Sequence, residues 1–233
     1  MSASLQQNGG VLDDEVFEAV TGLVVAGEYR DQIPGWEVVD LGLLALVDDF
    51  EAPPARRCTY ERGSRSHVAA RRHGLVEKLP PLEPASAAAV DEVERVAGVA
   101  LPPLLRRLYL EVGDGGFGPG YGLLSLRSDL VEQGRQAAEE PAVPMMLCSW
   151  GCGMVSYVDL ADGSVWSNGP GREGGATMEL WPHHFTLGEW LSQWVRRRLY
   201  PPWRTTDPVS GEPRLATYEE TVAMLGEQHW LDD

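Results

Sequence analysis

The sequence predicts an α+β fold, in which an antiparallel β-sheet is flanked by helices and an extra helical segment lies at the N-terminus. Apolar residues recur at helical spacing near both ends of the 233-residue chain, whereas the apolar runs between them are only as long as strands. The pair Asp162-Gly163 separates two of these runs and is a strong signal for a tight β-hairpin. Strands and helices do not alternate at the spacing of a parallel sheet, so an antiparallel sheet is expected.

The amino-acid composition indicates which classes of partner the protein is expected to bind. The chain holds 35 acidic and 19 basic residues, a formal charge of −16, and it is 43% hydrophobic, which is typical of a globular protein with a real core. Binding to duplex nucleic acid or to an anionic membrane needs a surplus of cations, so neither is an expected partner. The polar N-terminus lacks the pattern of a signal peptide, and a cytoplasmic location is predicted. The three cysteines, Cys58, Cys148 and Cys152, are then expected to be reduced.

Charge divides the chain into four segments. Residues 1–55 form an acidic helical segment of charge −10, and residues 56–78 form a basic connector or hairpin of charge +5. Residues 79–205 are predicted to be the α+β domain, and residues 206–233 a C-terminal helical tail. Pairing of the basic segment with its acidic neighbour is the simplest interpretation, and a phosphate-contacting strip or a disordered connector are the alternatives.

The helices are predicted from spacing and caps. Helical spacing of apolar residues indicates one helix around Val16–Val24 and a second between Trp36 and Phe50. Ser86 is expected to cap a helix that ends at Gly98, and Pro102-Pro103 to open another that Gly113 stops. Two later helices are each expected to begin with a capping box. The first box pairs Thr186 with Glu189, in a helix that runs to Leu199, and the second pairs Thr217 with Glu220.

The strands are predicted from short apolar runs. These runs are Tyr121–Leu126, Met145–Trp150, Met154–Asp159 and Ser164–Trp166, and the last two are joined by the Asp162-Gly163 turn.

The glycine-rich stretch Gly113–Gly120 is predicted to be a structural turn. Loops that cradle phosphate follow a strand and lead into a helix, whereas here the glycines follow a helix and precede a strand. Lys78 is the only lysine of the chain, so no phosphate-binding Lys-Ser or Lys-Thr pair is present. Phe117 and Tyr121 are expected to anchor the turn.

No combination of residues makes a convincing catalytic or metal site. Cys148 and Cys152 could join His183-His184 in a zinc site, but the cysteine spacing is poor and both thiols flank a tryptophan inside a predicted sheet. Asp159 and Asp162 are better explained by the hairpin than by acid/base catalysis. The chain is therefore predicted to be no enzyme and to need neither a metal nor a cofactor.

Residues from about 80 to 200 resemble the Smi/Knr family of the SUKH superfamily. The resemblance rests on the Ser86-capped helix, the stretches Leu101–Tyr109 and Gly113–Leu126, and a later block around Trp150–Tyr157. Asp114 stands where the family usually has asparagine. The motif residues that the resemblance marks as structural or partner-binding are Asp114, Gly115, Gly116, Phe117, Gly118, Pro119, Gly120, Tyr121, Trp150, Gly151 and Tyr157.

The resemblance implies a binding role without catalytic residues. Bacterial members of the superfamily are typically immunity proteins that neutralise a toxin, often a nuclease, and fungal members are regulatory scaffolds. Together with the negative charge, this favours an immunity protein whose acidic surface covers the basic cleft of a toxin domain. The alternatives are a scaffold that binds a housekeeping partner, and a negative charge that serves only solubility.

Overall fold

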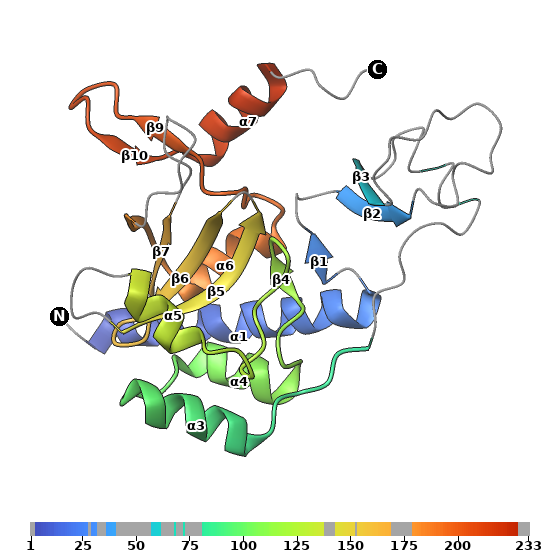
Figure 1. Cartoon of the computed structure of the whole chain (residues 1–233), viewed down its shortest axis with the longest axis vertical. Coiled ribbons are helices and arrows are strands. Elements are labelled where there is room, and N and C mark those ends of the chain that lie inside the picture. Colours follow the sequence, from blue (N-terminus) through green and yellow to red (C-terminus); the bar gives the residue numbers. More distant parts are fainter. Residues whose placement is uncertain are drawn as a thin grey trace.

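The predicted α+β class is confirmed by the computed structural model. The structure describes residues 3–27, 29–31, 36–40, 57–61, 68, 72, 81–137, 143–151, 153–168 and 179–227. Helices gather around a four-stranded antiparallel sheet with the strand order β5-β6-β7-β8 (Figure 1).

The described elements follow one another from α1 to α7. The helices are α1 (Ala3–Ala26), α3 (Ala87–Ala97), α4 (Pro103–Glu111), α5 (Leu130–Ala137), α6 (Leu187–Val195) and α7 (Tyr218–Glu227). The four-stranded sheet consists of β5 (Pro144–Gly151), β6 (Met154–Asp159), β7 (Ser164–Asn168) and β8 (Trp181–Thr186). Three small pairs complete the strands: β1 (Arg30–Asp31) beside β4 (Gly118–Pro119), β2 (Trp36–Asp40) beside β3 (Arg57–Glu61), and β9 (Arg204–Thr206) beside β10 (Pro213–Leu215).

Local signals set the ends of several helices as predicted. The Ser86 hydroxyl accepts a hydrogen bond from the Ala89 amide at the start of α3, and Gly98 ends that helix with a φ of 75°. Both sides of the capping box of Thr186 and Glu189 are formed at the start of α6.

The predicted hairpin between β6 and β7 is also confirmed. Gly163 has a φ of 75°, and the Asp162 carboxylate accepts a hydrogen bond of 2.8 Å from the Ser164 amide. Because the turn fixes the register, Tyr157 lies opposite Trp166 and Ser156 lies opposite Ser167.

Three predicted elements need correction. Trp36–Asp40 is a strand paired with Arg57–Glu61 rather than the start of a second helix, and the rest of that prediction, residues 41–50, lies outside the described residues. Tyr121–Leu126 is not a strand, because Gly122 bends it with a φ of 89° and only Leu123 forms an isolated bridge, to Cys148. The helix expected to reach Leu199 ends at Val195 and is followed by a left-handed residue, Arg197, with a φ of 59°.

Several short elements were not predicted. They include α5, the edge strand β8, and the pair of β9 with β10, and the predicted segment boundary at residues 205 and 206 falls inside β9. The sequence of β8, Trp-Pro-His-His-Phe-Thr, carries a proline and lacks a clear alternation of polar and apolar residues. Its pairing with β7 therefore depends on the rest of the sheet.

The N-terminal helix α1 belongs to the main hydrophobic core. Val16, Phe17 and Val20 are buried in the cluster that also holds the sheet and the helices α3 to α6. The guanidinium of Arg107 on α4 lies 3.6 Å above the Phe17 ring and 2.8 Å from the Asp14 carboxylate. In Figure 1, α1 crosses beneath the sheet with α4 and α3 below it. The described part of α1 is thus a structural layer of the domain.

Substitutions on α1 test this packing. We expect Val20→Ala, which removes methyl groups from a fully buried site, to lower the free energy of unfolding by about 2 kcal/mol. The same change at Val25, which is 85% exposed on the same helix, should alter it by less than about 0.5 kcal/mol. Urea unfolding of both variants measures the difference. Equal effects would mean that α1 does not pack on the core.

Candidate functional site

The glycine-rich motif lies along the outer edge of β5. The Leu124 amide donates to the Leu147 carbonyl over 2.8 Å, and the Tyr121 amide donates to the Ser149 carbonyl over 2.9 Å. The loop thereby satisfies edge carbonyls that a fifth strand would otherwise bind. Its first function is to close this edge of the sheet.

Close backbone approach explains why the loop is rich in glycine. Gly120 has a φ of 61°, and a Cβ atom placed there would lie 2.4 Å from the Ser149 carbonyl oxygen. Gly115 has a φ of 76°, and a Cβ atom there would lie 2.5 Å from the Leu123 carbonyl oxygen. Only glycine can adopt the left-handed backbone conformation and also lie this close to a neighbouring carbonyl oxygen.

Asp114 holds the two ends of the loop together. Its carboxylate accepts hydrogen bonds of 2.7 Å from the Leu126 amide and of 2.7 Å from the Ser125 hydroxyl, and its own amide donates to the Glu83 carbonyl. Arg127 approaches the same carboxylate to 3.6 Å. The carboxylate is occupied within the loop, and its side chain is only 15% exposed.

Most of the other motif residues are buried. Phe117, Trp150 and Tyr157 lie in the interior, and Gly151 packs so closely against Tyr121 that a Cβ atom would lie 3.0 Å from the tyrosine hydroxyl. Tyr121 is the large motif side chain that reaches the surface, with an exposure of 44%. The structure therefore brings the two motif blocks together, mainly through packing.

The other sequence candidates are engaged in structural contacts. Cys148 is a buried free thiol whose pKa is raised by burial, and Cys152 lies outside the described residues. Asp159 and Asp162 each accept a backbone hydrogen bond of 2.8 Å at the hairpin. Within the described ranges, no three His, Cys, Asp or Glu side chains are grouped so that they could hold a metal ion.

A row of polar side chains crosses the sheet and was not predicted. Nε1 of Trp150 donates to the Ser156 hydroxyl over 2.8 Å, and that hydroxyl lies 2.7 Å from the Ser167 hydroxyl. The Ser167 hydroxyl in turn lies 2.7 Å from Nε2 of His183. The four residues come from the four successive strands β5 to β8. In the sequence, the only indication of this row is the presence of small polar residues in otherwise apolar strands. The register of the sheet is what aligns them.

His183 is neutral at physiological pH. Burial lowers its pKa to about 4, and the neighbouring His184 contributes to the same shift. The neutral imidazole can accept a hydrogen bond from Ser167, and protonation would place a charge in a partly desolvated site, 6.5 Å from the centroid of the Trp190 ring.

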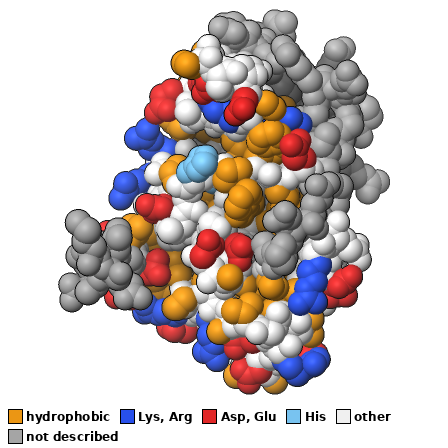
Figure 2. Space-filling view, turned by 90° about the vertical axis from the view of Figure 1, so that its left-hand side faces the viewer, with side chains coloured by type: hydrophobic (Ala, Val, Ile, Leu, Met, Phe, Trp, Pro, Cys, Tyr) orange, Lys and Arg blue, Asp and Glu red, His pale blue; other side chains and the backbone are white. Residues whose placement is uncertain are grey.

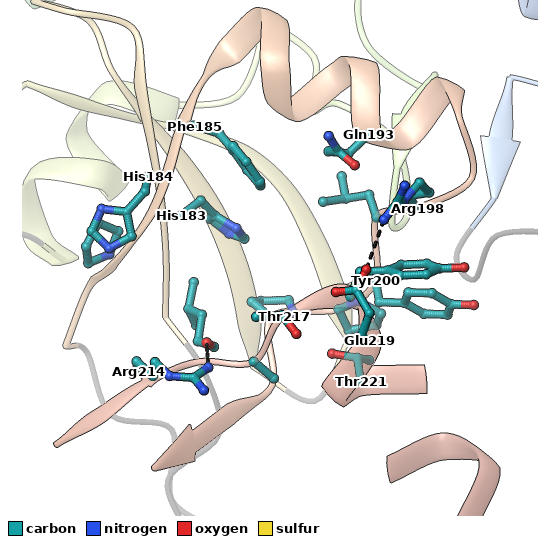
Figure 3. Close-up of a pocket in the computed structure, with 17 residues that line it drawn as sticks. His183, His184, Phe185, Gln193, Arg198, Tyr200, Arg214, Thr217, Glu219 and Thr221 are labelled. Atoms are coloured by element: carbon teal, nitrogen blue, oxygen red, sulfur yellow. Dashed lines mark hydrogen bonds and ion pairs between the residues drawn. The ribbon is translucent and has the colours of Figure 1, made fainter. Parts of the chain in front are cut away.

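A groove of about 450 Å³ opens in front of His183. Its walls come from β8, from residues 198–202 after α6, and from the segment 214–221 of β10 and α7 (Figure 3). Arg198 bonds to Glu219 over 2.9 Å and stacks on the Tyr218 ring at 4.9 Å. The charged groups at the rim are thus paired with one another.

Among the described residues, most arginines form ion pairs, whereas many carboxylates do not. Most arginines are held by carboxylates, as in the contacts of Arg95 with Glu92 and of Arg107 with Asp14. Many carboxylates have no cationic partner among the residues that the structure describes. They are Asp13, Glu15, Glu18, Glu83, Asp129, Glu132, Asp159, Asp162, Glu189 and Glu212.

Acidic side chains do not form a continuous patch on the face in Figure 2. Acidic and basic side chains alternate there with hydrophobic ones, and a histidine lies among them. On that face, the excess of acidic residues is therefore dispersed among other side chains and does not form a surface of a single sign.

None of the described helices combines the length and the apolarity that a membrane crossing requires.

Comparisons of the chain with protein-family models, with curated proteins and with solved structures find no match. The resemblance to the Smi/Knr family accordingly stays a prediction.

Glycine substitutions test the role of the edge loop. Gly120→Ala should lower the free energy of unfolding by about 3 kcal/mol, because it adds a backbone clash to the strain of the left-handed conformation. Gly163→Ala is the matched control, since Gly163 has a similar φ but nothing within 4 Å of the added atom, and it should cost about 1 to 2 kcal/mol. Thermal and urea unfolding measure both. If both variants lose the same stability, the loop does not press against β5.

The buried histidine predicts a pH dependence of stability. The folded-state pKa of His183 is about 4 and lies below its unfolded value of 6.5, so the unfolded state binds more protons between these values. The free energy of unfolding should fall by about 2 kcal/mol as the pH drops from about 7 to about 5. His183→Gln, whose amide can still bond to Ser167, should remove that slope. An unchanged slope in the variant would show that His183 is not responsible.

Proposed function

We propose that this protein is a non-enzymatic binding module that neutralises a basic toxin domain, as an immunity protein does. The observation that carries the proposal is that most described arginines form ion pairs with carboxylates of the same chain, whereas ten described carboxylates have no cationic partner among the described residues. Unpaired surface carboxylates attract a cationic partner and speed its encounter. A nuclease-type toxin is such a partner, because its active site needs cations to hold phosphates.

The geometry of the most enzyme-like pair supports a binding role. Ser167 and His183 lie at the distance of a nucleophile and its base, 2.7 Å. Ser167, however, is fully buried, and its hydroxyl is already shared with Ser156. A substrate would have to displace the core of the sheet to reach it.

The family resemblance supports the same function independently of charge. It implies a domain without catalytic residues, and bacterial members typically neutralise toxins. Most motif residues of this chain lie in the loop beside β5 or in the interior, and Tyr121 is the large motif side chain that is exposed. None of the ten carboxylates without a cationic partner is a motif residue, so the two arguments do not depend on each other.

The proposal is tested by co-expression with the protein encoded next to this one. We expect a one-to-one complex that restores growth of cells producing the toxin, and an association rate that falls steeply between about 50 and about 500 mM salt. A complex that is insensitive to salt would remove the electrostatic mechanism. Capture of a housekeeping partner without any rescue of growth would support the scaffold function instead.

A charge variant tests which carboxylates act. Exchange of four exposed unpaired acids, Glu15, Glu18, Glu83 and Glu132, for glutamine should slow association about tenfold at low salt. Exchange of the same four for aspartate keeps the charge and should leave the rate within about twofold. Surface plasmon resonance measures both, and thermal unfolding checks that each variant is folded. Equal rates for the two variants would contradict the proposal.

A further inference from the structure

The groove lies between β8 and the segment that follows α6, which includes β10 and the start of α7. It is lined by a strand of the main sheet and by residues 214–221, which lie more than 25 positions further along the chain. It involves none of the ten unpaired carboxylates, so an inference about it is independent of the acidic surface.

A polar group with a free nitrogen lies inside this groove. His183 reaches into the pocket above Thr217 (Figure 3), and its Nε2 is taken by the Ser167 hydroxyl. Its other ring nitrogen, Nδ1, has no hydrogen-bond partner among the described residues and is not one of the enclosed polar atoms. A ligand in the groove can therefore bond to Nδ1.

One of the two proton arrangements that the polar row allows places a hydrogen on Nδ1, and the proposal uses this arrangement. The indole nitrogen of Trp150 can only donate, so Ser156 accepts from it and is left to donate its own proton. If each hydroxyl passes its proton along the row, Ser167 donates to Nε2 of His183. A neutral imidazole then carries its hydrogen on Nδ1 and offers a donor to the groove.

The walls of the groove are flat, rigid and without free charge. Prolines and aromatic rings line it, namely Pro182, Pro201, Pro202, Phe185, Tyr200 and Tyr218. Arg198 is bound by Glu219, and Arg214 is bound by Glu220 over 2.6 Å. Such walls bury an uncharged, rigid chain with little loss of side-chain entropy.

The strand that borders the groove cannot extend its ladder to a partner strand. Pro182 has no amide hydrogen, and His184 has a φ of 58°, which turns the backbone out of the extended conformation. A partner at this edge is thus recognised through side chains and not by β-strand addition.

We propose that the groove binds a proline-rich segment of a partner protein, with a peptide carbonyl of that segment accepting from Nδ1 of His183. Proline has no amide hydrogen, and a polyproline II helix has no internal hydrogen bonds, so its carbonyls are free acceptors. With the hydrogen on Nδ1, the groove offers one donor between walls of prolines and aromatic rings.

The probe that tests this proposal is a fluorescently labelled deca-proline peptide added to the full chain. We expect saturable binding by fluorescence anisotropy, and no binding of a glycine-serine peptide of equal length. His183→Phe keeps the ring but removes Nδ1, and it should weaken binding about fivefold. Tyr200→Ala should weaken it by at least as much, whereas Val25→Ala, an exposed change on α1, should have no effect.

Nuclear magnetic resonance supplies a second measurement that does not depend on the stability of variants. The deca-proline peptide should shift the amide signals of residues 183–185, 198–200 and 214–221 and leave those of the edge loop unchanged. Nitrogen shifts of His183 should show the hydrogen on Nδ1. Absence of saturable binding, equal binding of the glycine-serine peptide, or signal changes confined to another face would overturn the proposal.

Discussion

The two edges of the four-stranded sheet impose the constraint on which the rest of the structure depends. An edge strand presents unpaired amides and carbonyls that must be covered, interrupted or left for a partner. At β5 the glycine-rich loop covers them with its own amides, through Tyr121 and Leu124. At β8 a proline and a left-handed residue interrupt the ladder instead. The first solution explains the sequence motif, and the second creates the space in which the groove lies.

Between these two edges, a row of hydrogen-bonded polar side chains crosses the otherwise apolar sheet. Trp150, Ser156, Ser167 and His183 satisfy one another, so that their burial is not penalised by missing hydrogen bonds. Nε1 of Trp190 lies beside this row, buried and without a partner among the described residues. The row therefore links the packing of the sheet to the protonation of one histidine at the groove.

The proposed functions use different parts of the molecule. The proposed toxin neutralisation would depend on carboxylates that no described arginine pairs with, and long-range attraction would increase its rate and selectivity. The groove has its charges paired and recognises shape and hydrogen bonding at short range. A single partner that carries a basic domain and a proline-rich segment could engage both, in which case the second contact would become intramolecular and increase the affinity.

Local signals in the sequence were enough for many elements. Ser86, Gly98, the box of Thr186 with Glu189, and the Asp162-Gly163 turn act within a few residues of the backbone groups that they bind. The structural role of the glycine-rich stretch also followed from its position after a helix. In contrast, the spacing of apolar residues at 36–40 suits a helix, but these residues form a strand. Their β-branched valines suit a strand, and pairing with residues 57–61 stabilises it.

The sequence by itself determined the α+β class, the caps, the hairpin and the excess of acid, because each of these depends on composition or on neighbours along the chain. Only the tertiary structure decided which carboxylates remain unpaired, that β8 joins the sheet, and that His183 meets Ser167. Those outcomes depend on strand register and on contacts between residues far apart in sequence. No local pattern encodes such contacts, since their energy appears only when the segments pack together.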